Sequence, residues 1–221
     1  RLSKDETIVR MPFEVRHMGS KYPIFSFDFT GAKRGVLPAS YDYLRLEGRM
    51  QYRLNLPPIG YSQLMLEGGK IFGKVPYLLL KLHEGNGTYF YDRYAFSCMN
   101  FYEFSSDAWI SFFYEHHFNG FLLGRVPLLK KLNWREVFVF KGVYGTLSAR
   151  NDGSLPNTKA VMLFPVGMSS VEHPYLETGF GIENIFRLLR VDCIWRLTHH
   201  RAVPGLSIPT FTVNFSLNLK F

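Results

Sequence analysis

The last eleven residues of the chain alternate strictly between apolar and polar side chains. From Phe211 to Phe221 they read Phe-Thr-Val-Asn-Phe-Ser-Leu-Asn-Leu-Lys-Phe. This period of two predicts a β-strand with one face in an apolar medium. Strands of roughly 9–11 residues cross a bilayer in tilted barrels, whereas the commonest strands of globular proteins run about five or six. The segment therefore predicts a membrane-spanning strand, and a strand of a soluble sandwich is the alternative.

The stretch from residue 42 to residue 54 alternates in the same way, but its second face is charged. That face carries Arg45, Glu47, Arg49 and Arg53, opposite leucines, a methionine and a tyrosine. An Arg that faces lipid at the bilayer midplane costs about 2–4 kcal/mol. We therefore expect this face to point into water, and the lumen of a barrel is the natural place for it.

Similar alternation recurs along the chain and gives about nine expected strands in all. The connections between them alternate between long and short when they are counted back from the C-terminus. Outer-membrane barrels have short periplasmic turns and long outside loops. The sequence thus predicts an all-β, antiparallel transmembrane barrel with Phe221 at the periplasmic side. The other expected strands are 7–17, 22–30, 59–71, 108–118, 135–147, 176–184 and 189–197.

Composition narrows the class of protein further. No apolar run approaches the roughly 20 residues of a membrane helix, and aromatic residues make up 17% of the chain. The net charge is +8, but Lys and Arg are scattered and no nucleic-acid-binding motif occurs, so we expect contact with anionic lipids or a basic lumen. Cys98 and Cys193 stand alone and are expected to act as small hydrophobic residues, with a disulfide as the alternative.

The long connection 72–107 is too aromatic for a solvated loop tip. Loops of this length are usually functional, and we expect this one to fold into the barrel, where Asp92 and Arg93 would pair with lumen charges. A cap over the barrel mouth is the alternative. The connection 121–132 is amphipathic and predicts either a short interfacial helix or a plain loop.

Glu115-His116-His117 is the one constellation that invites a chemical role. Neighbouring strand residues point to opposite faces, so Glu115 and His117 share the expected lumen face while His116 does not. A polar lumen pair is the default interpretation, and a metal site is the alternative. Because phosphate-binding, zinc-binding and nucleophile motifs are all lacking, we expect no cofactor, no metal and no enzymatic activity.

Several motifs resemble one protein group. They are residues 85–96 (Gly-Asn-Gly-Thr-Tyr-Phe-Tyr-Asp-Arg-Tyr-Ala-Phe), 115–120, 126–137, 175–186, 190–192 and 195–198. They resemble the C-terminal barrel of Bacteroidota outer-membrane proteins that carry an N-terminal carboxypeptidase-regulatory-like domain, a family of unknown function. That barrel is similar to the surface-antigen barrels of the outer-membrane assembly and two-partner secretion machinery.

This resemblance implies a sixteen-stranded barrel, of which residues 1–221 would be the C-terminal portion. Arg1, which is not followed by a signal-peptide core, would then be internal to a longer protein whose N-terminal domains are absent. Phe221 would be the terminal aromatic that the insertion machinery reads, and Arg93 would correspond to the Arg of the in-folding loop. The sequence departs from the superfamily in two places: no Gly follows Arg93, and Lys141 stands where an Asp is expected.

Three hypotheses for function follow. The first is an integral protein of the bacterial outer membrane with a role in outer-membrane biogenesis or protein translocation and assembly. Its partners would be outer-membrane lipids and other outer-membrane or periplasmic proteins, with no nucleic acid. The second is a pore or scaffold subunit of an outer-membrane complex, and the third is a membrane-embedded enzyme that uses Glu115 and His117.

Overall fold

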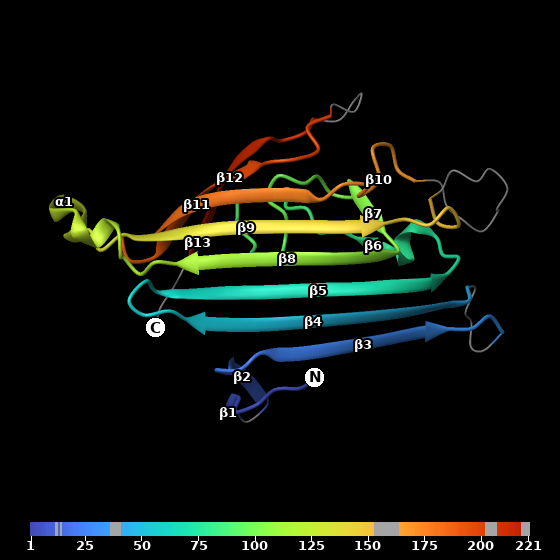
Figure 1. Cartoon of the computed structure of the whole chain (residues 1–221), viewed down its shortest axis with the longest axis horizontal. Helices are drawn as coiled ribbons and strands as arrows, with labels where there is room; N and C mark the ends of the chain where they lie inside the picture. Colours follow the sequence, from blue (N-terminus) through green and yellow to red (C-terminus); the bar gives the residue numbers. More distant parts are fainter. Residues whose placement is uncertain (12, 14, 36–40, 153–163, 202–206, 218–221) are drawn as a thin grey trace.

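Eight antiparallel strands form one continuous sheet in the computed structural model, which describes residues 1–11, 13, 15–35, 41–152, 164–201 and 207–217 (Figure 1). The order across the sheet is β13-β12-β11-β9-β8-β5-β4-β3, so each strand lies beside its predecessor along the chain. The strands are β3 (Ile24–Ala32), β4 (Tyr43–Asn55), β5 (Tyr61–Gly73), β8 (Ala108–His117), β9 (Arg135–Thr146), β11 (Tyr175–Ile185), β12 (Leu189–Arg196) and β13 (Phe211–Leu217).

The predicted all-β antiparallel class is confirmed, and eight of the nine expected strands are present in the main sheet. Within the described residues this sheet is open, with β3 and β13 as its edges. The prediction of one strand over 7–17 is wrong. Two short strands, β1 (Thr7–Arg10) and β2 (Val15–Gly19), pair with each other instead. The stretch contains Pro12, and a proline has no N–H for a strand ladder.

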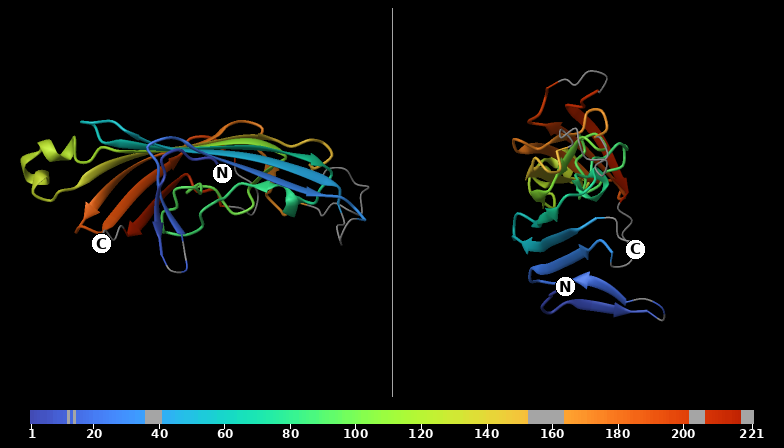
Figure 2. Two further views of the ribbon diagram at one scale, coloured as in Figure 1. Left: turned by 90° about the horizontal axis from the view of Figure 1, so that it is seen from below. Right: turned by 90° about the vertical axis from the view of Figure 1, so that its right-hand side faces the viewer.

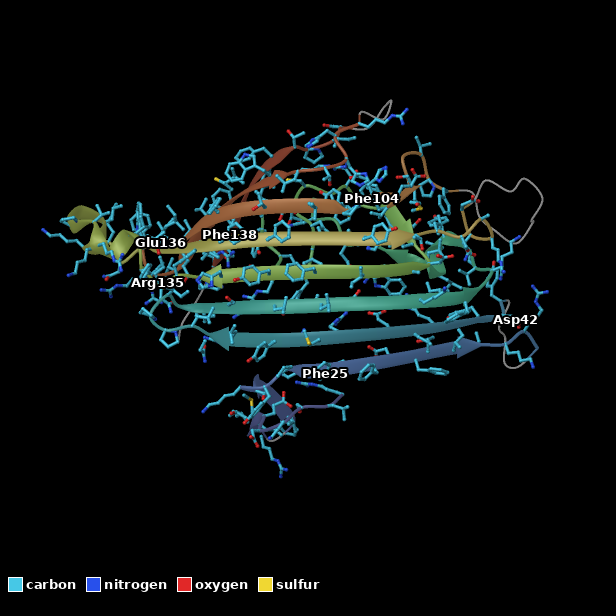
Figure 3. The ribbon with its side chains drawn as sticks, viewed as in Figure 1. Phe25, Asp42, Phe104, Arg135, Glu136 and Phe138 are labelled. Carbon is cyan, nitrogen blue, oxygen red and sulfur yellow. The ribbon has the colours of Figure 1, made fainter. Side chains whose placement is uncertain are left out.

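The connections between successive strands of the main sheet leave it alternately at its two ends. Those that follow β3, β5, β9 and β12 start at one end, where Asp42 lies (Figure 3). The tight turns after β4 and β11 lie at the other end, together with the β8–β9 connection near Arg135 and Glu136. That connection contains the short helices η2 (Leu123–Arg125) and α1 (Pro127–Lys130), so a helical element is present where the sequence predicted a helix or a loop.

The long connection between β5 and β8, residues 74–107, packs against one face of the sheet. Figure 2 shows it beneath that face, with β12 and β13 curling toward it. It contains the helical turn η1 (Tyr77–Leu79), β6 (Lys81–Leu82) and β7 (Phe104–Ser106), and β7 also pairs with β10 (Ser169–Ser170). Phe96, Met99 and Phe104 from this connection form a buried apolar cluster with Phe113 and Tyr175 of the sheet.

The two faces of the sheet differ sharply in chemistry. One, called here the inner face, carries the charged residues and is covered by residues 74–107 over its central strands. The other, the outer face, is aromatic and aliphatic and is exposed in this chain: Phe27 is 69% exposed and Phe180 60%. The further exposed apolar residues of this face include Phe29, Leu46, Ile110, Tyr144, Trp195, Phe211, Phe215 and Leu217.

None of the helices in the described part of the chain has the length and apolar content that a membrane crossing requires.

Candidate functional site

Glu115, near the end of β8, is the centre of a buried network of charged side chains on the inner face. It is only 1% exposed. Its Oε2 accepts a hydrogen bond from Arg93 Nε at 2.7 Å, and its Oε1 accepts one from Arg190 Nη2 at 3.2 Å. The hydroxyl of Tyr91 also donates to Oε1. One strand carboxylate thus binds two side chains from residues 74–107 and one from β12.

The surrounding groups extend this network without leaving the inner face. Arg190 donates to both oxygens of Asp192, at 2.7 and 2.8 Å, which is the strong fork-like geometry of an arginine–carboxylate pair. His117 lies between two carboxylates, with Nε2 3.5 Å from Glu115 Oε2 and Nδ1 3.1 Å from Glu183 Oε2. We call Tyr91, Arg93, Glu115, His117, Arg190 and Asp192 the Glu115 cluster.

Two further anchors hold the middle of residues 74–107 against the sheet. Glu177 of β11 accepts the backbone N–H groups of Ser97 and Cys98, at 2.9 and 2.7 Å. Lys141 of β9 donates to the carbonyl oxygens of Asp92 and Ala95, at 2.7 and 2.6 Å. Both strand side chains are fully buried. The hydrogen bonds that each would form with water are therefore replaced by hydrogen bonds to the backbone of residues 74–107.

The two ends of the connection are tied down by ion pairs. Near its start, Lys81 Nζ lies 2.7 Å from Glu67 Oε1 of β5. Near its end, Glu103 Oε1 accepts a hydrogen bond from Arg196 Nη2 of β12 at 2.6 Å. Five different strands therefore each supply at least one charged side chain to residues 74–107. A buried ion pair that loses one partner leaves an uncompensated charge, so this network resists partial detachment.

The structure brings four of the five predicted residues to this region. Arg93, Glu115 and His117 meet in the Glu115 cluster, as expected from their pairing with the inner face. Asp92 also lies beside a sheet charge: its backbone carbonyl accepts a hydrogen bond from Lys141, its carboxylate interacts electrostatically with the same ammonium, and the carboxylate accepts the N–H of Tyr94. The prediction for Phe221 falls outside the described residues.

His116 points away from the cluster, as the alternation predicts. Its Nδ1 lies 2.8 Å from Ser62 Oγ and its Nε2 3.0 Å from the carbonyl oxygen of Ile59. Cys98 and Cys193 are both free thiols, so the expectation of unpaired cysteines is confirmed. Within the described ranges, no group of three or more His, Cys, Asp or Glu residues is placed to hold a metal ion.

Sequence reasoning missed most of the anchors, although a signal for them exists. Glu177, Arg190, Asp192 and Arg196 all occupy the polar positions of strands whose alternation was recognised. A charged residue at such a position is costly unless it finds a partner. Residues 74–107 form a long, aromatic connection that also carries charges, so they can supply partners for the charged strand residues. The same rule identifies Glu67 and Lys141.

A buried histidine beneath the sheet gives a testable dependence of stability on pH. His83 is 2% exposed, and its Nε2 lies 2.9 Å from Ser106 Oγ. Burial, reinforced by the Lys81 ammonium, lowers the pKa of His83 from 6.5 to about 3. Between these values the unfolded chain binds a proton that the folded chain does not, so stability is lost as the pH falls from 6.5 toward 3.

We therefore expect His83→Gln to flatten the loss of heat resistance between pH 7 and pH 4.5. The measurement is the temperature at which folded protein disappears at each pH. His173→Gln is the matched control, because His173 is exposed and its loss should leave the pH profile unchanged. An identical slope for His83→Gln and the parent protein would contradict the prediction.

These contacts attach residues 74–107 to the inner face of the sheet. The charged groups pair with one another and with backbone groups, with His117 Nε2 left without a hydrogen-bond partner among the described residues, and they fix the 34-residue connection to the central strands of the sheet. Residues 6–149, well over half of the chain, match the family model described as "Family of unknown function (DUF5686) C-terminal domain". No curated protein matches the chain.

Proposed function

Because the chain belongs to this DUF5686 C-terminal domain family, whose function is unknown, its role rests on its own residues, and we propose that it is part of the wall of an outer-membrane β-barrel. The outer face would contact lipid, and residues 74–107 would fill the lumen beside the Glu115 cluster. The observation that carries this proposal is the contrast between the two faces of the sheet, with exposed aromatic side chains on the outer face and buried charged side chains on the inner face.

An exposed apolar face across a whole sheet is unusual for a water-soluble protein, which supports the membrane placement. Soluble monomers rarely expose a continuous apolar patch larger than a few hundred Å², yet the outer face is apolar across all eight strands. The inner face carries charged residues on seven of the eight strands and no strand-length apolar surface. In a bilayer both features become favourable, because lipid covers the aromatic side chains and the polar lumen accommodates the charges.

Spin labels at two neighbouring positions test the membrane placement. Phe29→Cys lies on the outer face and Thr30→Cys on the inner face, in full-length protein in which Cys98 and Cys193 are replaced by alanine. After reconstitution into liposomes, the label at position 29 should be accessible to dissolved oxygen and shielded from a water-soluble nickel complex. The label at position 30 should show the reverse. Equal access of the nickel complex to both labels would overturn the proposal.

For the cellular role, we favour outer-membrane biogenesis or protein translocation over an open pore. The support is that residues 74–107 occupy the inner face of the central strands and are anchored there by buried ion pairs. An open solute channel does not need such a filled interior, and a pore has to keep its lumen clear. We infer from the same anchoring that Glu115 and His117 act as structural residues that hold residues 74–107 in place.

Depletion of the protein in cells separates these roles. If it serves biogenesis, other outer-membrane barrel proteins should decline in the membrane while their synthesis continues. If it is a pore, their levels should stay constant while permeability to small solutes falls. Quantitative proteomics of the membrane fraction, together with solute uptake, measures both outcomes in the same cells.

A further inference from the structure

The β4–β5 turn, the β8–β9 connection and the β11–β12 turn lie side by side at one end of the sheet and contact one another. His116 Nε2 lies 3.0 Å from the carbonyl oxygen of Ile59, so the first turn packs against the end of β8. Asn184 Nδ2 donates to the carbonyl oxygen of Asn133 at 2.7 Å, which joins the other two. Figure 1 shows α1 beyond the strand ends. We call residues 56–60, 118–134 and 186–188 the rim.

Each of the three parts of the rim exposes large apolar side chains. Phe186 is 85% exposed and Leu122 51%. The other exposed apolar residues of the rim are Ile59, Val126, Leu132 and Leu188. Contiguous exposed apolar surface marks a site of interaction with a protein, a membrane or a ligand, so the rim is a candidate interaction surface.

The charge of the rim is of one sign. Residues 48–66, 118–135 and 184–191 contain no Asp or Glu. The exposed cations of the rim are Arg125, Lys130, Lys131 and Arg187. The carboxylate that follows the rim, Glu136, accepts the backbone N–H of Leu123. The connections at the opposite end of the sheet contain Asp42, Asp152 and Glu172 as well as cations. The rim is therefore both apolar and cationic, and the opposite end is mixed.

The β11–β12 turn keeps bulky residues in a backbone conformation that disfavours them. Phe186 and Arg187 have φ angles of +50° and +69°, and the turn closes with a hydrogen bond from Leu188 N–H to the Ile185 carbonyl at 3.2 Å. Asn-Gly adopts two successive positive φ angles with far less strain. Strained residues of this kind cluster at functional positions. The turn thus presents an aromatic ring and a cation where a less strained pair would present neither.

This combination fits an anionic lipid surface. Apolar side chains enter the boundary between headgroups and acyl chains, and Lys and Arg are attracted to anionic headgroups. The three tips follow the order of the strands across the sheet, so they form a row, as contact with a membrane surface requires. Trp134 lies in the same connection as Lys130 and Lys131, and Trp is enriched at membrane–water interfaces.

We propose that the rim binds anionic phospholipids of the leaflet at this end of the sheet. Phe186, Leu122 and Val126 enter the headgroup boundary, and Lys130, Lys131 and Arg187 pair with phosphate groups. This inference rests on the proposed function, and it adds a lipid preference that is confined to one end of the barrel wall.

Quenching of a fluorescent label by brominated lipids tests the proposal. A bimane label is attached to Val126→Cys in full-length protein without other cysteines. The protein is reconstituted into vesicles of two parts phosphatidylcholine to one part phosphatidylglycerol, with bromine on one lipid or the other. Per lipid molecule, brominated phosphatidylglycerol should quench the label roughly threefold more than brominated phosphatidylcholine, because each nearby cation attracts anionic headgroups.

Two triple variants of equal charge locate the preference. Lys130→Gln, Lys131→Gln and Arg187→Gln together should bring the quenching ratio of the two lipids close to one. The control combines Lys33→Gln, Arg150→Gln and Arg201→Gln, which removes the same charge from exposed positions at the opposite end of the sheet. It should keep the ratio of the parent. An equal loss in both triple variants would show that net charge, and not the rim, attracts the lipid.

The strained turn is tested separately with the label at Leu188→Cys. Phe186→Asn combined with Arg187→Gly should lower quenching by both lipids at least about twofold, because the apolar tip is lost. The same variant should unfold in detergent at an equal or higher temperature than the parent, because Asn-Gly suits the turn. Unchanged quenching would contradict insertion of this turn.

The outcomes separate this inference from the proposed function. Equal quenching by the two brominated lipids overturns the lipid preference. A label at position 126 that neither lipid quenches also overturns it, because the rim is then in water or covered by protein. A label at Phe29→Cys in the same vesicles reports on the proposed function alone. If lipid quenches that label, the membrane wall stands whatever the rim does, and if lipid does not, the proposed function itself fails.

Discussion

Glu115→Ala should lower the free energy of unfolding by about 3–5 kcal/mol, the usual effect of removing one partner from a buried ion pair. The reason is geometric. Arg93 and Arg190 both donate to this carboxylate, at 2.7 and 3.2 Å. Without it, Arg93 loses the only carboxylate within 4 Å among the described residues, while Arg190 keeps Asp192. The measurement is the temperature at which the folded, fast-migrating form of the full-length protein disappears on a gel.

A surface carboxylate provides the control for this prediction. Glu84 is 60% exposed at its side chain and lies 3.0 Å from Lys81, so Glu84→Gln should change stability by less than about 1 kcal/mol. The double variant Glu115→Gln, Arg93→Gln should be less destabilised than the sum of its single variants, because both members of the pair are then neutral. A Glu115 variant with the heat resistance of the parent would show that the cluster does not brace residues 74–107.

Alternation predicts the strands well because it is a local property of the chain. The charged face of 42–54 reappears in β4, where Arg49 pairs with Glu67 across to β5 at 2.7 Å. The apolar face of 211–217 reappears as the outer side of β13. The error over 7–17 arises where alternation and a proline conflict, because the pattern of side chains says nothing about the backbone hydrogen bonds that proline removes.

The network beneath the sheet is harder to predict because it depends on pairings between distant parts of the chain. Glu177 accepts hydrogen bonds from the backbone N–H groups of Ser97 and Cys98. Because almost every residue has a backbone N–H, the sequence does not indicate which of them will bind a given carboxylate. The bridge between the backbones of Phe90 and Phe215 is of the same kind, since any residue except proline supplies these groups. Arg93 and Glu115 were identified individually, but their mutual contact required the register of β8 and the path of residues 74–107.

Phe27→Arg should destabilise the membrane-inserted protein by about 2–4 kcal/mol, the cost of an arginine that faces lipid at the bilayer midplane. Phe27 lies in the middle of β3 on the outer face, and its ring lies 3.6 Å from the position that a Cβ atom would take at Gly48 of β4. An arginine there loses the aromatic contact and places a charge in hydrocarbon. We expect less folded protein in the outer membrane and a lower temperature of unfolding for the fraction that does insert.

Ser26→Arg is a closely matched control, since it introduces the same side chain one residue away in the same strand. Ser26 faces the inner side, where Arg49 is its neighbour across the ladder and Asp28 lies two residues along on the same face. The added charge would lie beside Asp28 and opposite Arg49, which is already paired with Glu67, so folded yield and heat resistance should fall far less than in Phe27→Arg. If both variants insert equally well, the outer face does not contact lipid, and the charged inner face needs another explanation. If only Phe27→Arg loses folded protein, the outer face of the sheet contacts lipid and the inner face contacts the aqueous lumen, as the alternation of side chains predicts.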